Sequence, residues 1–253
     1  MDLGLSGKVA LVTGSSRGIG LGIARSLAAE GANVMLTARG EERLNASVAE
    51  LGALGTVAGL VVDVTAADGA QAAVDAAVER FGGLDIVVNN VGGSGARSLA
   101  ETDDVELRRL VEINLGSGYS VSRAALPFLR DGGGVICFVA SIWGRESGGA
   151  VGYNVAKGAV VNLASSMARE LAADGVRVFS VAPGCIRHPG GSWDRRVLED
   201  PEGMAAFVER EIPWNRFGTA EEVGDVVAFL CSPRASWVVG ACLPLDGGQS
   251  RSL

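Results

Sequence analysis

Short apolar segments rich in β-branched residues alternate with longer amphipathic segments, and this alternation limits the fold more than any other feature. Many of the short segments are continuous apolar runs, such as Val9–Val12, which predict strands that are covered on both faces. Such strands occur in parallel sheets wrapped by helices. Strands are predicted at 8–12, 33–38, 56–62, 84–89, 134–140, 176–182 and 239–245. Helices are predicted at about 18–30, 41–51, 66–81, 102–130, 150–173 and 220–231.

The pattern predicts an α/β protein with one doubly wound, seven-stranded parallel sheet and helices on both faces. No repeat or composition break divides the chain, so we expect residues 1–253 to form a single domain. Its ligand crevice should lie at the carboxyl ends of the strands. Residues 184–219 interrupt the alternation with an irregular stretch that contains prolines, glycines and two tryptophans. We expect this stretch to be a lid over the substrate.

Charge and composition exclude several classes of function. The chain has 29 acidic and 22 basic residues and a formal net charge of -7, so neither nucleic acid nor an anionic membrane is an expected partner. No apolar run is long enough to span a membrane, and the first residues do not form a secretion signal, so we expect a cytoplasmic protein. The four cysteines form no C-x-x-C pair and His188 is the single histidine, so we predict no metal site.

A glycine-rich segment follows the first predicted strand. It reads Thr13-Gly14-Ser15-Ser16-Arg17-Gly18-Ile19-Gly20 and opens a predicted helix. Glycines allow a pyrophosphate to approach the backbone closely, and the helix N-terminus offers free N–H groups to its charge. Taken alone, the segment is also compatible with a glycine-rich turn that binds nothing.

The end of the second predicted strand indicates which dinucleotide is bound. An acidic residue there would bind the ribose 2′-hydroxyl of NAD, but the chain has Ala38 and Arg39. Arg39 and Arg17 could hold a 2′-phosphate, so NADP(H) is favoured over NAD(H). The alternative is a solvated Arg39 that pairs with Glu41 or Glu42.

Four polar residues form a candidate catalytic group. Tyr153 and Lys157 are four residues apart in a predicted helix and therefore lie on one face of it. A nearby ammonium favours the phenolate form of tyrosine, so the phenol can exchange a proton closer to neutral pH. Ser141 ends the fifth predicted strand, and Asn114 is polar within an otherwise apolar helix. Each residue also has an ordinary structural interpretation, as a surface pair, a helix cap or a core amide.

Together these motifs resemble the short-chain dehydrogenase/reductase family, in its single-domain NADP-preferring branch, and they are similar to those of 3-oxoacyl-carrier-protein reductases. The resemblance covers about residues 7 to 248. Its motifs occur in the family's order, as the Thr13–Gly20 loop, Asp63-Val64, Asn89-Asn90-Val91-Gly92, Asn114, Ser141, Tyr153 with Lys157, and Pro183-Gly184.

The resemblance implies a Rossmann-type fold and hydride transfer between a nicotinamide and a carbonyl or alcohol carbon. It implies that Tyr153 is the general acid or base, that Lys157 lowers its pKa, that Ser141 binds the substrate oxygen and that Asn114 holds a relay water. The cofactor contacts implied are Gly14, Ser16, Arg17, Gly18, Ile19, Gly20, Arg39, Asp63, Val64, Asn90, Gly92, Tyr153, Lys157, Pro183, Gly184 and Ile186.

The chain departs from the family pattern near the substrate. Only 12 positions separate Ser141 from Tyr153, one fewer than usual, so the loop between them is short. His188 stands where many relatives have a threonine that contacts the nicotinamide carboxamide. His188 could replace that contact, bind substrate or be an ordinary loop residue. Trp143 and Trp193 could stack on a flat substrate, or pack in the core or between subunits.

Several functions remain open on the sequence alone. The first is a ketoreductase for a 3-oxoacyl thioester, a polyketide-like compound or another small ketone. The alternatives are a sugar or cyclic-alcohol dehydrogenase and a non-enzymatic NADP-sensing module, although the complete Asn114, Ser141, Tyr153 and Lys157 set favours an enzyme. The acidic chain makes an acidic acyl carrier protein a disfavoured partner, although Arg123, Arg130, Arg195 and Arg196 could form a basic patch. The resemblance also implies a homotetramer.

Overall fold

The computed structural model describes residues 1–252, so Leu253, which the single-domain prediction includes, lies outside the described residues. Seven strands form one sheet in the order β3-β2-β1-β4-β5-β6-β7, and all neighbouring strands are parallel. This confirms the predicted doubly wound sheet. The strands are β1 (Val9–Val12), β2 (Asn33–Ala38), β3 (Val57–Val61), β4 (Ile86–Asn89), β5 (Gly134–Val139), β6 (Val176–Pro183) and β7 (Cys242–Leu245).

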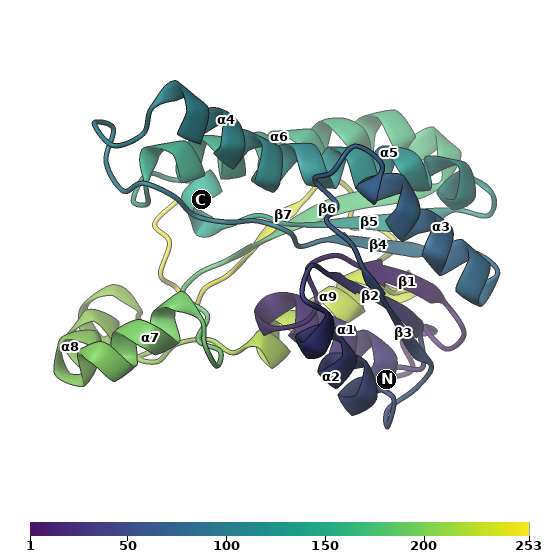
Figure 1. Cartoon of the computed structure of the whole chain (residues 1–253), viewed down its shortest axis with the longest axis horizontal. Coiled ribbons are helices and arrows are strands. Elements are labelled where there is room, and N and C mark those ends of the chain that lie inside the picture. The colour runs from purple at the N-terminus through teal and green to yellow at the C-terminus, as the bar shows by residue number, and fades with distance from the viewer. Residues whose placement is uncertain (253) are drawn as a thin grey trace.

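Two layers of helices cover the two faces of the sheet (Figure 1). One face carries α1 (Gly18–Ala29), α2 (Glu41–Leu51) and α9 (Ala220–Cys231), and the other carries α3 (Gly69–Phe81), α4 (Asp104–Val111), α5 (Ser117–Arg130) and α6 (Val151–Leu171). Alternate residues of each strand point to opposite faces, so Ala10 and Val12 pack into one core while Val9 and Leu11 pack into the other. The continuous apolar runs therefore fill two cores.

Helices α1 and α9 touch backbone to backbone. A Cβ placed on Gly22 would lie 2.3 Å from the Ala220 carbonyl oxygen, and one on Gly224 would lie 2.4 Å from the Gly22 carbonyl oxygen. Ser26 Oγ also donates a hydrogen bond to Asp225 Oδ1 at 2.8 Å. These contacts fix the helix that begins at the glycine-rich loop.

The predicted helix over 102–130 is interrupted. A π-helical turn at Glu112–Gly116 separates α4 from α5 and contains Asn114. The apolar periodicity continues through this turn, so the sequence pattern gives no sign of the interruption.

The prediction that 184–219 is irregular is wrong in part. This segment contains α7 (Ser192–Glu199) and α8 (Pro201–Glu211), which project from the body of the protein (Figure 1). Asp200 caps α8, because its Oδ1 accepts a hydrogen bond from Gly203 N at 2.9 Å, and Pro201 occupies the first turn. The prediction took proline and glycine as breakers, but here they mark the start of a short helix.

We expect Gly22→Ala to destabilise the fold by about 1–3 kcal/mol, because the new methyl group overlaps the α9 backbone. Urea unfolding followed by tryptophan fluorescence measures the change. Gly83→Ala is the matched control, since a Cβ there would have no neighbour within 4 Å. Equal unfolding midpoints for the two variants would contradict the close packing of α1 against α9.

Candidate active site

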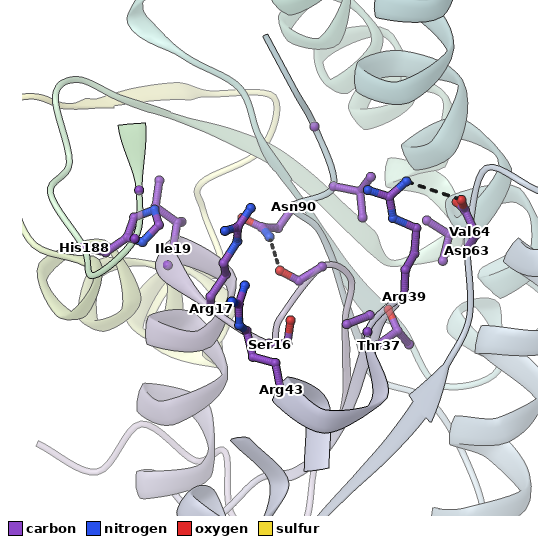
Figure 2. A pocket seen from close by; sticks show the side chains of 18 of the residues that line it. Ser16, Arg17, Ile19, Thr37, Arg39, Arg43, Asp63, Val64, Asn90 and His188 are labelled. Atoms are coloured by element: carbon purple, nitrogen blue, oxygen red, sulfur yellow. Dashed lines mark hydrogen bonds and ion pairs between the residues drawn. The ribbon is translucent and has the colours of Figure 1, made fainter. Parts of the chain in front are cut away.

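A large cavity of about 1140 Å³ lies at the carboxyl ends of the central strands, where the doubly wound topology predicts a ligand crevice. Figure 2 shows side chains that line it. Its walls come from the loops after β1, β2, β3 and β4 and from the segment between β6 and α7. The cavity is therefore built by elements that are distant in the sequence, and it is large enough for a dinucleotide.

The glycine-rich loop forms one wall of this cavity. Gly14 and Gly18 have positive φ angles of 62° and 57°, which favour glycine. Asn90 Nδ2 donates to the carbonyl oxygens of Thr13 and Gly14, both at 3.0 Å, and so holds the loop in shape. No side chain caps the N-terminus of α1, so its first N–H groups are free to bind an anion.

Three arginines surround the part of the cavity near β2. Arg17, Arg39 and Arg43 all line it, and Figure 2 shows them around the same space. Arg39 Nη1 lies 3.7 Å from Asp63 Oδ2, while the Arg39 side chain is 74% exposed. Glu41 and Glu42 line the cavity as well, so the surface carries both signs of charge. Three mobile guanidinium groups can nevertheless converge on a phosphate.

Asp63 stands at the end of β3 and is held in place by its neighbours. Hydrogen bonds from the Thr65 hydroxyl and backbone N–H, with a smaller contribution from Arg39, lower the pKa of the Asp63 carboxyl. Because Asp63 pairs with Arg39, the alternative pairing of Arg39 with Glu41 or Glu42 is not the arrangement in this structure.

The cavity residues fit a dinucleotide phosphate. Thr37 Oγ1 is buried at the end of β2 and, within residues 1–252, has no hydrogen-bond partner. Thr37 also lines the cavity, so a bound ligand can supply the missing partner. Together with the free helix N-terminus and the arginines, this unpaired hydroxyl favours a polar, phosphorylated ligand.

Ser141, Tyr153 and Lys157 come together at the end of β5. Burial raises the pKa of the Tyr153 phenol, and a hydrogen bond with the Ser141 side chain lowers it in part. The Ser141 Oγ also accepts a hydrogen bond from Trp143 N at 3.2 Å. The hydroxyl groups of Ser141 and Tyr153 therefore lie close enough to bind the same small oxygen atom.

Lys157 is a buried cation beneath Tyr153. Its side chain is 4% exposed, and burial lowers its pKa to about 8. The Nζ atom donates to the Val139 carbonyl oxygen at 2.8 Å and lies 5.8 Å from the centre of the Tyr153 ring. The predicted lowering of the Tyr153 pKa by Lys157 is not found in this structure, where burial has the largest effect and raises the pKa.

Asn114 joins this group through the π-helical turn. Its Nδ2 donates to the carbonyl oxygens of Gly93 at 2.8 Å and Leu110 at 2.9 Å, while its Oδ1 accepts from Gly93 N at 3.1 Å. A Cβ placed on Gly92 would lie 2.7 Å from Asn114 Oδ1 and 3.2 Å from Lys157 Nζ. The backbone of Gly92 therefore lies close to both the Asn114 side chain and the Lys157 ammonium group.

The predicted cofactor residues divide into two sets. Those that line the large cavity are Gly14, Ser16, Arg17, Gly18, Ile19, Arg39, Asp63, Val64, Asn90 and Gly92. Within residues 1–252, those outside its lining are Gly20, Tyr153, Lys157, Pro183, Gly184 and Ile186. Gly20 lies behind the loop, where a Cβ would be 2.5 Å from Asn90 Nδ2. Ile186 lines a separate, smaller cavity of about 230 Å³ beside α9.

Arg43 and Thr37 line the cavity but were not predicted as site residues. Thr37 is the second-last residue of β2, and Arg39 follows directly after the strand. Arg43 stands one helical turn further on, in α2. Both residues could be predicted to line the cavity once the bounds of β2 and α2 are known.

The other three predicted substrate residues, besides Ser141, lie in different surroundings. His188 lines the large cavity and packs over the glycine-rich loop, because a Cβ on Gly18 would lie 2.7 Å from its Nε2 (Figure 2). Trp193 stacks on Phe207 with ring centres 5.2 Å apart, inside the small core of α7 and α8. Trp143 lies between Ser141 and Tyr153, and Gly148 packs against its ring.

Other kinds of site receive no support from the part of the chain that is described. Among residues 1–252, no three His, Cys, Asp or Glu side chains group as ligands for a metal ion. In the same range, no helix combines the length and hydropathy needed to span a membrane.

Comparison with known proteins agrees with this geometry. Residues 14–250 match the family model described as enoyl-(acyl carrier protein) reductase. The 3-oxoacyl-[acyl-carrier-protein] reductase FabG of Vibrio cholerae is 38% identical over 249 residues, covering 98% of this chain and 99% of that protein. Dehydrogenase/reductase SDR family member 4 of Oryctolagus cuniculus is 35% identical over 254 residues, covering 98% and 96%.

A solved structure is similar over its whole length. L-sorbose reductase from Gluconobacter frateurii, crystallised with NADPH and L-sorbose, superposes with a TM-score of 0.95 at 35% identity, and each chain is covered completely. The family match, the sequence relatives and the similar fold show that the chain belongs to the short-chain dehydrogenase/reductase family.

Proposed function

We propose that this protein is an NADP(H)-dependent ketoreductase that transfers a hydride between the nicotinamide and a ketone or secondary alcohol. The observation that carries the proposal is the grouping of Ser141, Tyr153 and Lys157 beside a cavity lined with arginines. A protein that only binds NADP(H) and catalyses no reaction would need the cavity but would not need Ser141, Tyr153 and Lys157. NADPH in the sorbose reductase structure supports the choice of cofactor.

Each residue of the group has a distinct task in carbonyl reduction. Bound NADPH supplies the hydride. Tyr153 donates a proton to the carbonyl oxygen, and Ser141 holds that oxygen through a hydrogen bond. Lys157 carries a positive charge that favours the phenolate left behind. Asn114 holds a water molecule through which Lys157 exchanges protons with solvent.

Residues in and around the large cavity would hold NADP(H). The free N–H groups at the start of α1 would bind its diphosphate, as expected for an anion at a helix N-terminus. Arg17 and Arg39, assisted by Arg43, would bind the 2′-phosphate, and Asp63 would contact the adenine. Pro183, Gly184 and Ile186 would contact the nicotinamide, and His188 would contact the cofactor or the substrate.

A small, free ketone is the favoured substrate. The FabG relative, named for a 3-oxoacyl group carried on acyl carrier protein, supports a 3-oxoacyl thioester or polyketide-like compound, and the sorbose reductase supports a sugar. An acidic carrier protein remains disfavoured. Arg130 of the predicted basic patch pairs with Asp174 at 2.7 Å, and Arg196 stacks on Trp193 at 4.6 Å, so half of that patch is already engaged.

We expect Tyr153→Phe to reduce kcat for carbonyl reduction by about a hundredfold or more, because general acid catalysis contributes that much. NADPH binding, followed by its fluorescence, should change little. Tyr119→Phe is the matched control, since Tyr119 is the other tyrosine and lies exposed on α5. Turnover by Tyr153→Phe at the wild-type rate would remove Tyr153 from the mechanism.

We expect Arg39→Asp to weaken NADPH binding about 10- to 100-fold relative to NADH, because the variant replaces a charge-assisted bond by repulsion. Titration of the two cofactors in parallel measures the ratio. Arg80→Asp is the control. Arg80 lies in the last turn of α3, at the edge of the sheet opposite the carboxyl ends of the strands. An unchanged ratio for Arg39→Asp would contradict the 2′-phosphate assignment.

We propose that the protein is a homotetramer. Exposed apolar side chains support this assembly, and they are Tyr119 on α5, Val155 on α6, Leu243 on β7 and Trp237. Light scattering should give four times the chain mass of 25.8 kDa. Trp237→Glu should yield smaller species, because Trp237 is 97% exposed in the single chain and the charge would be buried on assembly. A monomeric mass for the wild-type protein would contradict the proposal.

A further inference from the structure

Glu146 lies in the short loop between Ser141 and Tyr153 and holds the end of the chain. Its Oε2 accepts hydrogen bonds from the backbone N–H groups of Arg251 at 2.8 Å and Ser252 at 2.7 Å. Two successive N–H groups that converge on one carboxylate form a charge-assisted contact. This contact joins segments that are more than one hundred residues apart in the sequence.

The same terminal residues are also attached to the lid. We call residues 249–252 the C-terminal tail. Gln249 Oε1 accepts from Cys185 N at 3.0 Å, and Gln249 Nε2 donates to Cys185 Sγ at 3.1 Å. Cys185 belongs to the small core of α7 and α8, so the tail is anchored at the base of the lid.

The turn before the tail leaves it little freedom. Asp246 accepts hydrogen bonds from Gly248 N at 3.0 Å and from Ser250 N at 2.8 Å. Trp214 N, just after α8, donates to the Gly247 carbonyl oxygen at 3.0 Å. The tail therefore bridges two segments that flank the catalytic group, which are the 141–153 loop and the lid.

We propose that the C-terminal tail is a fixed wall of the substrate pocket and that Glu146 is the positioning residue that holds it there. The inference rests on the proposed ketoreductase function for its effect on substrates. Glu146 touches neither the reacting atoms nor the cofactor in this account. It acts through the tail, which limits the size of the carbonyl compound that reaches Ser141 and Tyr153.

Hydrogen exchange tests the contact without any substrate. In Glu146→Gln the charge is lost while the size of the side chain is kept. The amides of Arg251 and Ser252 should then exchange about tenfold faster or more, as measured by mass spectrometry of the C-terminal peptide. Glu79→Gln, an exposed position on α3, is the matched control and should exchange as the wild type does. Wild-type exchange of these amides in Glu146→Gln would overturn the proposed role of Glu146.

Steady-state kinetics tests the effect on specificity. The two probes are ethyl acetoacetate and the bulkier ethyl benzoylacetate. Glu146→Gln and a chain that ends at Gly248 should both lower KM for the bulky ester relative to the small one by about fivefold or more, with little change in the NADPH Kd. If the ratio of KM for the bulky ester to KM for the small ester is unchanged in Glu146→Gln, the proposal that the tail limits substrate size is overturned. If the wild-type protein reduces neither these esters nor any other ketone, the proposed function fails, while the exchange result still decides the contact.

Discussion

The candidate active site depends on a buried ammonium group. Lys157 is almost completely enclosed, and burial lowers its pKa to about 8, so the charged form is costly. Its described hydrogen bond goes to the carbonyl oxygen of Val139, at the last position of β5. A charge in this position is useful only if something beside it becomes negative, which a tyrosine does when it gives up a proton. The cost of burying Lys157 therefore argues for chemistry at Tyr153.

Two helices on opposite faces of the sheet carry the groups that the proposed chemistry needs. On one side, α1 is fixed against α9 by Gly22 and Gly224, so the free N–H groups at its start are held at the edge of the sheet. On the other side, α6 carries Tyr153 and Lys157 on one face. Three further segments belong to neither helix, and these are the 141–153 loop, residues 184–219 and the C-terminal tail, which hydrogen bonds join to both of the others. This arrangement separates cofactor binding, which needs fixed N–H groups, from substrate selection.

The sheet and the placing of Tyr153 and Lys157 on one helix could be predicted because their signals are local. Continuous apolar runs predict buried parallel strands, and the four-residue spacing of Tyr153 and Lys157 predicts a shared helix face. The two helices of the lid were missed, because each is short and begins beside a proline or glycine. The π-helical turn at Asn114 leaves no mark in the periodicity. The contact between Glu146 and the tail joins distant backbone N–H groups to a side chain, and no sequence pattern encodes such a contact.

The transfer of one labelled hydrogen tests the central claim most directly. The purified protein is incubated with NADPH that carries deuterium at the transferable C4 position, together with a panel of ketones, and the products are analysed by mass spectrometry and NMR. The account predicts a secondary alcohol with one deuterium on the carbinol carbon. Tight binding of NADPH with no deuterium in any product across ketones, sugars and 3-oxo esters would contradict it.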